Sequence, residues 1–330
     1  MAIWKESNRL KIFIFTELES LMKLIRHRIN IRSKHAGCVA TIGNFDGVHL
    51  GHLDLIKRLN LQATRLNLPG TVILFEPQPA EFFSKDHLPD RVTRLREKIR
   101  LLEYYQVDRV VVLKFDNLLA SYTAVEFVDE ILVRSLGVKA LVVGDDFRFG
   151  KGREGDHNLL SELTDSRGFQ LERAPAFSVG GQRVSSTIVR DRLKSGDIAG
   201  AEEMLGHSYF IEGRVAQGHK KGREWGFPTA NINLDKFQIP LSGIFAARVS
   251  GLSSKKLDAV AYVGSRPIIN DPRYVLEAHI FDFDTDCYSV HITVEFVERI
   301  RDDMNFDSFD VMSKQIQKDC LSAKEIFKNE

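Results

Sequence analysis

The sequence predicts a Rossmann-like α/β domain with a parallel sheet, followed by a small antiparallel β-barrel and a C-terminal helix. Two observations favour this fold. Short apolar, β-rich runs alternate with helical patterns up to about residue 185, which is typical of a parallel sheet covered by helices. Beyond that point, strand-like runs follow one another with turn signals between them, as in a small barrel. A length of 330 residues leaves room for about two such domains.

The first half contains four expected strands and three expected helices. The strands are expected at residues 39–42, 71–75, 109–113 and 140–144, and the helices at 50–66, 91–105 and 124–136. Right-handed crossovers then make the strands parallel, and ligands of such sheets bind at the carboxyl ends of the strands. Three motifs follow strands in this way, at residues 43–52, 75–79 and 144–150.

In the second half, helices are expected at 185–194 and 198–205, strands at 209–216, 243–250, 257–263, 274–283 and 290–296, and a last helix at 308–327. The change of pattern predicts one domain at 22–205 and a second at 206–330, with the boundary near 204–208. Residues 1–21 precede the segment that carries the motifs and are expected to be a poorly ordered N-terminal extension, as the ends of domains commonly are.

Composition excludes several classes of protein. The 46 basic and 45 acidic residues leave a net charge of +1, which argues against a broad nucleic-acid-binding surface and leaves a local basic site open. The sequence has no apolar run long enough to span a membrane and no pattern of a signal peptide. The three cysteines are too few and too scattered for a disulfide framework, so we expect a reducing, cytoplasmic location.

The most informative segment is residues 43–52, Gly-Asn-Phe-Asp-Gly-Val-His-Leu-Gly-His. It places His49 and His52 where a strand turns into a helix, at the positive end of the helix dipole, where an anion is favoured. Imidazoles there can donate hydrogen bonds to charge that develops on a phosphoryl group. The alternatives are part of a metal site or simple helix-start residues. The nucleotide-binding candidates in this segment are Gly43, Asn44, Phe45, Asp46 and Gly51.

This segment resembles the HxGH signature of the nucleotidyltransferase superfamily. With its Asn-Phe-Asp-Gly prefix, it is similar to the adenylyltransferase half of the bacterial bifunctional riboflavin kinase/FAD synthetase family. The resemblance extends in order over residues 22–325. It implies that the enzyme phosphorylates riboflavin to FMN with ATP and then adenylylates FMN to FAD, releasing pyrophosphate. It also implies a requirement for Mg²⁺ and assigns His49 and His52 to the α-phosphate of ATP.

Further motifs of the first domain match the same family. The segment 145–152 matches a loop near the flavin, which makes Asp145, Asp146, Phe147 and Phe149 candidate flavin-binding residues. A Ser-Ser-Thr-x-x-Arg motif matches a triphosphate-binding segment and gives the candidates Ser185, Ser186, Thr187 and Arg190. Simple capping of a helix is the alternative for these hydroxyls. Thr93, Arg94 and Lys98 form a related basic helix, for which a solvated face is an equally good interpretation.

In the second domain, residues 218–231 match the family's glycine-rich loop and Pro-Thr-Ala-Asn motif. The nucleotide-binding candidates are Gly218, Gly222, Arg223, Gly226 and Pro228, and the resemblance assigns Thr229 and Asn231 to Mg²⁺. It makes Glu277 the base that accepts the 5′-hydroxyl proton of riboflavin; an exposed strand carboxylate is the alternative. Arg301 matches the closing segment and is a candidate flavin-binding residue.

The second domain also departs from the family pattern. The segments 264–268, 286–289 and 243–246 differ from the usual motifs, most clearly at Ile268 and Ser289. These changes put the flavin pocket and the kinase rate in question. Two other hypotheses therefore stay open: an enzyme with only the adenylyltransferase activity, and a flavin- or nucleotide-binding regulator without turnover. Expected partners are riboflavin, FMN and ATP, and the chain is expected to be a monomer or to self-associate weakly.

Overall fold

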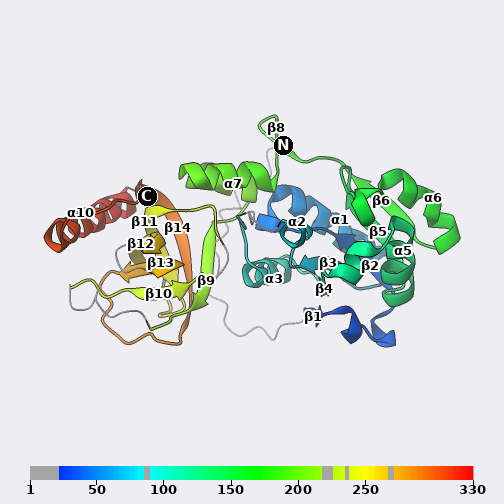
Figure 1. Cartoon of the computed structure of the whole chain (residues 1–330), viewed down its shortest axis with the longest axis horizontal. Coiled ribbons are helices and arrows are strands. Elements are labelled where there is room, and N and C mark those ends of the chain that lie inside the picture. Colours follow the sequence, from blue (N-terminus) through cyan, green and yellow to red (C-terminus); the bar gives the residue numbers. More distant parts are fainter. Residues whose placement is uncertain (1–21, 85–89, 218–225, 235–237, 267–270, 330) are drawn as a thin grey trace. The chain divides into compact units, whose positions relative to one another are not determined.

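The computed structural model describes residues 22–84, 90–217, 226–234, 238–266 and 271–329 (Figure 1). Their contacts divide them into two units. The sheet unit contains the described residues of 22–84 and 98–185. The barrel unit contains residues 90–97 and the described residues from 186 onward.

The sheet unit is built on six parallel strands in the order β1-β4-β3-β2-β5-β6. The strands are β1 (Lys23–Arg26), β2 (Cys38–Ile42), β3 (Gly70–Glu76), β4 (Arg109–Lys114), β5 (Val138–Gly144) and β6 (Gln170–Ala174). All five residues of β2 are buried. A parallel strand covered on both faces favours such a continuous apolar run. The predicted parallel sheet is therefore confirmed, whereas the two edge strands, β1 and β6, were not among the expected strands.

Helices connect these strands. They are α1 (Leu50–Leu66), α2 (Pro79–Phe83), α3 (Leu95–Tyr104), α4 (Asn117–Ser121), α5 (Ala124–Phe127), which continues as a π-helix (Val128–Ser135), and α6 (His157–Arg167). The helix expected at 91–105 begins only at Leu95. The preceding segment is held in another conformation, because the backbone N–H of Arg91 donates to the carbonyl of Gln238 at 2.9 Å.

The barrel unit holds six antiparallel strands in the order β10-β13-β12-β11-β14-β9. They are β9 (Phe210–Arg214), β10 (Ala230–Asn233), β11 (Gly243–Ser250), β12 (Leu257–Arg266), β13 (Asp271–Ile280) and β14 (His291–Arg301). A bridge between Ala216 and Asn231 brings the chain after β9 against β10, so that the sheet nearly closes on itself. This confirms the predicted antiparallel barrel. Phe245 and Phe296 fill its interior edge to face, with ring centroids 5.4 Å apart.

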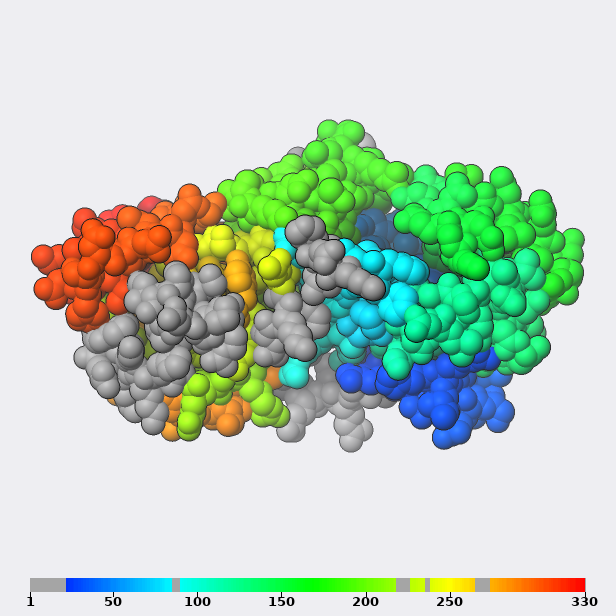
Figure 2. All heavy atoms as spheres, viewed as in Figure 1, coloured from blue at the N-terminus to red at the C-terminus, as the bar shows by residue number. Residues whose placement is uncertain are grey.

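The C-terminal helix α10 (Phe309–Lys328) packs against the outside of the barrel, where Ala323 lies among Ile244, Ala246 and Val260. Figure 2 shows the last part of the chain, coloured orange to red, at the surface. The predicted C-terminal helix is therefore confirmed.

Two short helices, α7 (Ser186–Ser195) and α8 (Ile198–Leu205), also belong to the barrel unit. One face of α8 is buried, and the carboxylate of Glu202 accepts a hydrogen bond from the backbone N–H of Tyr209 at 3.1 Å. The carbonyl of Ser195 accepts one from Arg299 at 3.2 Å. Packing thus joins residues 186–205 to the barrel, while the boundary predicted near 204–208 concerns the functional domains and stays a prediction.

Candidate active sites

The three motifs of the first domain follow three neighbouring strands. Strand β2 pairs with β3 on one side and with β5 on the other. Residues 43–52 follow β2, residues 75–79 lie at the end of β3, and residues 144–150 lie at the end of β5. Because all three strands are parallel, their carboxyl ends meet at one edge of the sheet. The structure therefore gathers these motifs at one edge, where a ligand of such a sheet is expected.

Residues 43–49, called here the histidine turn, have an unusual backbone. Phe45 has φ 48°, Gly47 has φ 82° and Val48 has φ 43°. A β-branched residue such as Val48 rarely adopts a left-handed conformation. Residues held in this way cost about 1–3 kcal/mol each and persist only where the surrounding structure enforces them. Phe45 and Val48 are both fully buried, which indicates that packing holds the turn in this shape.

His49 and His52 are brought together by this turn. His49 is the N-cap of α1, and its Nδ1 accepts a hydrogen bond from the backbone N–H of His52 at 3.3 Å. The two rings stack with centroids 3.7 Å apart, and Phe45 lies 4.8 Å from the second ring. A neutral His49 whose Nδ1 accepts must carry its proton on Nε2. A side chain at Gly51 would lie 3.3 Å from the ring of His49, so glycine leaves room for the histidine.

Burial lowers the pKa of His52 well below its usual value, and the neighbouring His49 and Lys98 lower it further. Its Nδ1 is buried and has no hydrogen-bond partner among the described residues. His52 is therefore neutral at physiological pH. A neutral imidazole can still donate one hydrogen bond, and no positive charge on it has to be neutralised first.

The sequence did not decide whether Lys98 lies on a solvated helix face or belongs to the site. A solvated helix face was as good an interpretation of the sequence as a site, yet Lys98 is only 2% exposed. Its ammonium group donates to the backbone carbonyl of Asn44 in the histidine turn. The signal in the sequence is a lysine at the position where α3 repeats apolar residues, since Leu101 and Leu102 follow three and four residues later and are buried.

The segment after β5 lies partly inside the core. Phe149 is 7% exposed, and its ring stacks on Phe147 with centroids 5.4 Å apart. Asp146 accepts a hydrogen bond from Arg183 at 2.5 Å, and Asp145 lies 3.7 Å from the same guanidinium. A flavin contact of these four candidates stays a prediction.

The Ser-Ser-Thr-x-x-Arg motif lies at the start of α7. Ser186 and Thr187 are in its first turn, immediately after Ser185, and Arg190 follows one turn later. The guanidinium of Arg190 donates to the carbonyl of Asp90 at 2.8 Å. Ser185 belongs to the sheet unit and the others to the barrel unit. Their assignment to phosphates stays a prediction.

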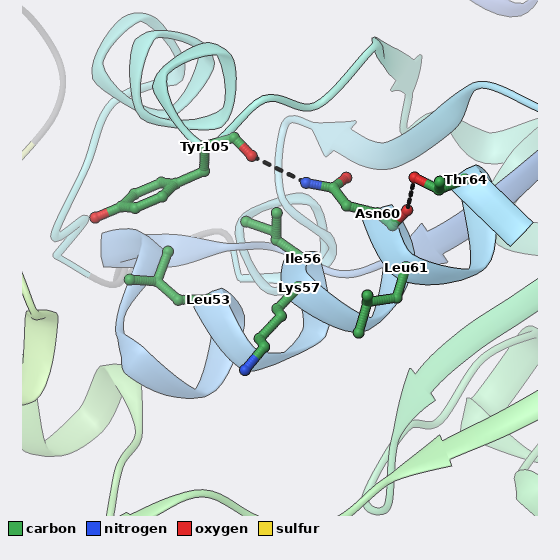
Figure 3. A pocket seen from close by; sticks show the side chains of 7 residues that line it. All are labelled: Leu53, Ile56, Lys57, Asn60, Leu61, Thr64 and Tyr105. Carbon is green, nitrogen blue, oxygen red and sulfur yellow. Dashed lines mark hydrogen bonds between the residues drawn. The ribbon is translucent and has the colours of Figure 1, made fainter. Parts of the chain in front are cut away.

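The structure also shows a groove of about 330 Å³ along α1 that Tyr105 helps to line (Figure 3). The amide of Asn60 donates to the carbonyl of Tyr105 at 3.1 Å across one end. Leu53, Ile56 and Leu61 line it, and Lys57 lies beside them. None of the predicted site residues lines this groove, so it is separate from the histidine turn.

The kinase candidates lie on the outer face of the barrel. Glu277 on β13 is the cross-strand neighbour of Asn231 on β10 and of Tyr262 on β12. Residues directly opposite each other in a sheet point to the same face, so these three side chains share one surface. Leu276 and Ala278, which alternate with Glu277, are fully buried in the interior.

Thr229 and Asn231 are linked directly. The amide nitrogen of Asn231 donates to the carbonyl of Thr229 at 3.0 Å and lies 3.3 Å from its hydroxyl. This contact brings a hydroxyl and an amide together beside the carboxylate of Glu277. Gly226 and Pro228 are exposed and come just before this pair. The predicted residues Gly218, Gly222 and Arg223, and the departure at Ile268, lie outside the described residues.

The closing segment is held by ion pairs. The guanidinium of Arg301 donates to both carboxylate oxygens of Asp319 at 2.8 and 2.9 Å, and it lies 5.7 Å from the ring of Phe306. The hydroxyl of Tyr262 donates to Asp303 at 3.0 Å. Arg301 therefore has a structural role in the fold, and its predicted contact with the flavin stays a prediction.

Comparison with known proteins decides the family. Residues 31–188 match the family model of FAD synthetase, and residues 205–327 match that of riboflavin kinase. The bifunctional riboflavin kinase/FMN adenylyltransferase of Escherichia coli K12 is 46% identical over 93% of this chain and 98% of its own length. The chain belongs to the bifunctional riboflavin kinase/FMN adenylyltransferase family. The predicted function, a riboflavin kinase joined to an FMN adenylyltransferase with ATP as co-substrate, is thereby confirmed.

Other relatives agree with this family. The protein of the same description from Haemophilus influenzae is 44% identical over 93% of this chain and 99% of its own length. Among solved structures, a protein described as a macrolide-efflux protein from Streptococcus pneumoniae is 28% identical, with a TM-score of 0.77, over 92% of this chain and 99% of that chain. Among the described residues, no helix is both long and apolar enough to cross a membrane.

Proposed function

We propose that the two activities of the family use separate sites on this chain. FMN adenylyl transfer takes place at the carboxyl edge of the parallel sheet, and riboflavin phosphorylation takes place on the outer face of the barrel. The observation that carries this proposal is that the two sets of candidates lie on different elements: the histidine turn belongs to the sheet unit, whereas Asn231 and Glu277 belong to the barrel unit.

Adenylyl transfer needs no nucleophile from the protein, because the phosphate of FMN attacks the α-phosphate of ATP and pyrophosphate leaves. The protein has to align the reactants and stabilise the charge of the transition state. His49 presents its Nε2 proton, since its Nδ1 is occupied as an acceptor. The ring of His52 stacks on that of His49, and the N-terminus of α1 adds the positive end of the helix dipole.

Phosphorylation needs a base and a metal. Glu277 would take the proton of the 5′-hydroxyl of riboflavin as that oxygen attacks the γ-phosphate. The residues around it suit Mg²⁺, because this ion prefers oxygen ligands and Thr229, Asn231 and Glu277 place a hydroxyl, an amide and a carboxylate side by side. Thr229 and Asn231 would hold the ion, which neutralises charge on the ATP phosphates when it is bound.

The direct experiment is to incubate the protein with riboflavin, ATP and Mg²⁺ and to separate FMN from FAD by chromatography. A second reaction starts from FMN, and a third contains EDTA in place of Mg²⁺. We expect FMN and then FAD in the first, FAD alone in the second, and neither product in the third. FMN without FAD, or FAD only from supplied FMN, would contradict the presence of two working sites.

We also propose a cellular location and an oligomeric state for the enzyme. We place it in the cytoplasm, where its substrate ATP is available and where its three free cysteines stay reduced. We expect it to act as a monomer or to self-associate weakly, without a nucleic acid or a membrane as a partner. Sedimentation velocity over a range of protein concentrations tests the oligomeric part.

A further inference from the structure

Lys98 is a buried cation beside the proposed adenylyl-transfer site. It is 2% exposed and lies on the face of α3 that also buries Leu101 and Leu102. Placing an ammonium group among apolar side chains costs free energy unless hydrogen bonds compensate it. An apolar residue would pack at this position without that cost. The lysine therefore calls for an explanation beyond packing.

One contact of Lys98 is with the histidine turn. Its ammonium group donates to the carbonyl oxygen of Asn44. That oxygen belongs to the peptide unit between Asn44 and Phe45, so the bond fixes the orientation of this peptide and with it the φ of Phe45, which is 48°. A hydrogen bond from a charged donor is about twice as strong as one between neutral groups. Lys98 is therefore well suited to hold a strained backbone.

The histidine turn positions the rings of His49 and His52. The ring of Phe45 lies 4.8 Å from that of His52, and the carbonyl of Phe45 accepts a hydrogen bond from the backbone N–H of Val48, the residue before His49. A rotation of the Asn44–Phe45 peptide would thus move both rings. We propose that Lys98 is a positioning residue for adenylyl transfer, which holds the histidine turn in its left-handed shape. This inference rests on the adenylyl transfer proposed above.

Two further observations support this role. The ammonium group of Lys98 bonds to the backbone of the histidine turn, so it acts on the histidines through that peptide. Its charge also contributes to the lowered pKa of His52, after burial and His49, and so keeps that ring neutral. The same lysine therefore supports both the position and the charge state of the histidines.

The test uses the full-length enzyme and Lys98→Met, which keeps the length of the side chain and removes its donor and charge. We expect kcat for FMN adenylylation to fall by about 10²-fold, the usual cost of a small misplacement of catalytic groups. The KM values for FMN and ATP should stay within about two-fold, since uniform binding is not affected. Riboflavin phosphorylation by the same protein should not change and serves as an internal control.

Lys57→Met is the matched control. Lys57 is exposed beside the groove on α1 in the same unit, so its loss should leave both activities as in the wild type. A second variant, Lys98→Ala, leaves space for an added alkylammonium ion such as ethylammonium. Partial recovery of kcat by ethylammonium, but not by the neutral ethanol, is the expected result and distinguishes a positioned charge from simple packing.

The outcomes separate the inference from the proposal on which it rests. A wild-type enzyme that makes no FAD from FMN would overturn the adenylyl transfer itself. A wild type that makes FAD, together with a Lys98→Met enzyme whose kcat is within about three-fold of it, would overturn only the role of Lys98. A Lys98→Ala enzyme that is not recovered by ethylammonium and melts well below the wild type would show a purely structural lysine.

Discussion

The two units position their candidate site residues in different ways. In the sheet unit, the candidates come from the ends of three neighbouring parallel strands and from the first turn of α1, so backbone conformation decides where His49 and His52 lie. In the barrel unit, Asn231 and Glu277 lie on the paired strands β10 and β13, so strand register decides where these two side chains lie. The first site depends on one strained turn, and the second depends on ordinary sheet geometry.

This difference predicts which substitutions should impair each activity. A site made from a turn can be damaged by a change that no substrate touches, as proposed for Lys98. A site made from strand faces should tolerate changes in the barrel interior as long as the register survives.

Cutting the chain should give the largest effect. A fragment of residues 206–330 should phosphorylate riboflavin and make no FAD, because the histidine turn is absent. A longer fragment of residues 186–330 should be more stable, since α8 buries Ile198, Met204 and Leu205, each worth about 1.5–3 kcal/mol. Product analysis and thermal unfolding measure both effects. A folded fragment without phosphorylation would show that the kinase was assigned to the wrong half.

Glu277→Gln should have the next largest effect. The amide keeps the size and hydrogen bonding of the side chain but cannot act as a base, so phosphorylation should fall by about 10²–10⁴-fold. ATP affinity and FAD formation from supplied FMN should change little. Initial rates with riboflavin, alongside a titration with ATP, provide the measurement. Near-wild-type phosphorylation would indicate that alignment and Mg²⁺ supply most of the catalysis and that Glu277 is not the base.

Replacing either histidine should affect only the sheet unit. His49→Ala or His52→Ala should cost about 2–4 kcal/mol of transition-state stabilisation in adenylyl transfer, by analogy with the loss of a preorganised donor. Riboflavin phosphorylation should persist in both variants. The readout is kcat/KM for FMN and for riboflavin in the same preparation. Equal losses of both activities in a folded variant would contradict separate sites.

The smallest effect should be a pH dependence of stability confined to the sheet unit. Burial lowers the pKa of His52 and of His35, so below about pH 6.5 the unfolded chain binds protons that the folded unit does not. Stability should therefore decrease as the pH falls from 7.5 to 5.5. Urea unfolding at both pH values measures this decrease, and His52→Gln should reduce it. An equal decrease in wild type and variant would assign the effect to other groups.

Much of the sheet site could be predicted from the sequence. The motif at 43–52 combines glycines, histidines and a strand–helix transition, all of which are local signals. The burial of Lys98 could not be predicted with the same certainty, because a lysine in a basic helix is compatible with solvent and its partner, Asn44, lies 54 residues away. The edge strands β1 and β6 were missed for a similar reason: four or five residues carry little periodicity, and pairing with β4 and β5 defines them.

For the candidate residues of the barrel, the sequence predicts the face of the strand but not the neighbouring strands. The period of two along a strand puts Glu277 and His279 on one face without any knowledge of the structure. The sequence does not predict which strands pair with β13, because the neighbours of an antiparallel strand depend on the topology of the sheet. The same applies to α7 and α8, whose contacts with Tyr209 and Arg299 join them to the barrel although their sequence continues the first domain.

The alternation along β13 limits which mutations this strand can accept. Leu276 and Ala278 are fully buried, while Glu277 between them lies on the opposite face of the strand beside Asn231. Single substitutions can alter one face and leave the other intact. Loss or gain of one codon before Glu277 would instead turn the carboxylate inward and a leucine outward, because a shift of one residue exchanges the two faces of a strand. Inherited variation in this strand should therefore be in residue type and not in length.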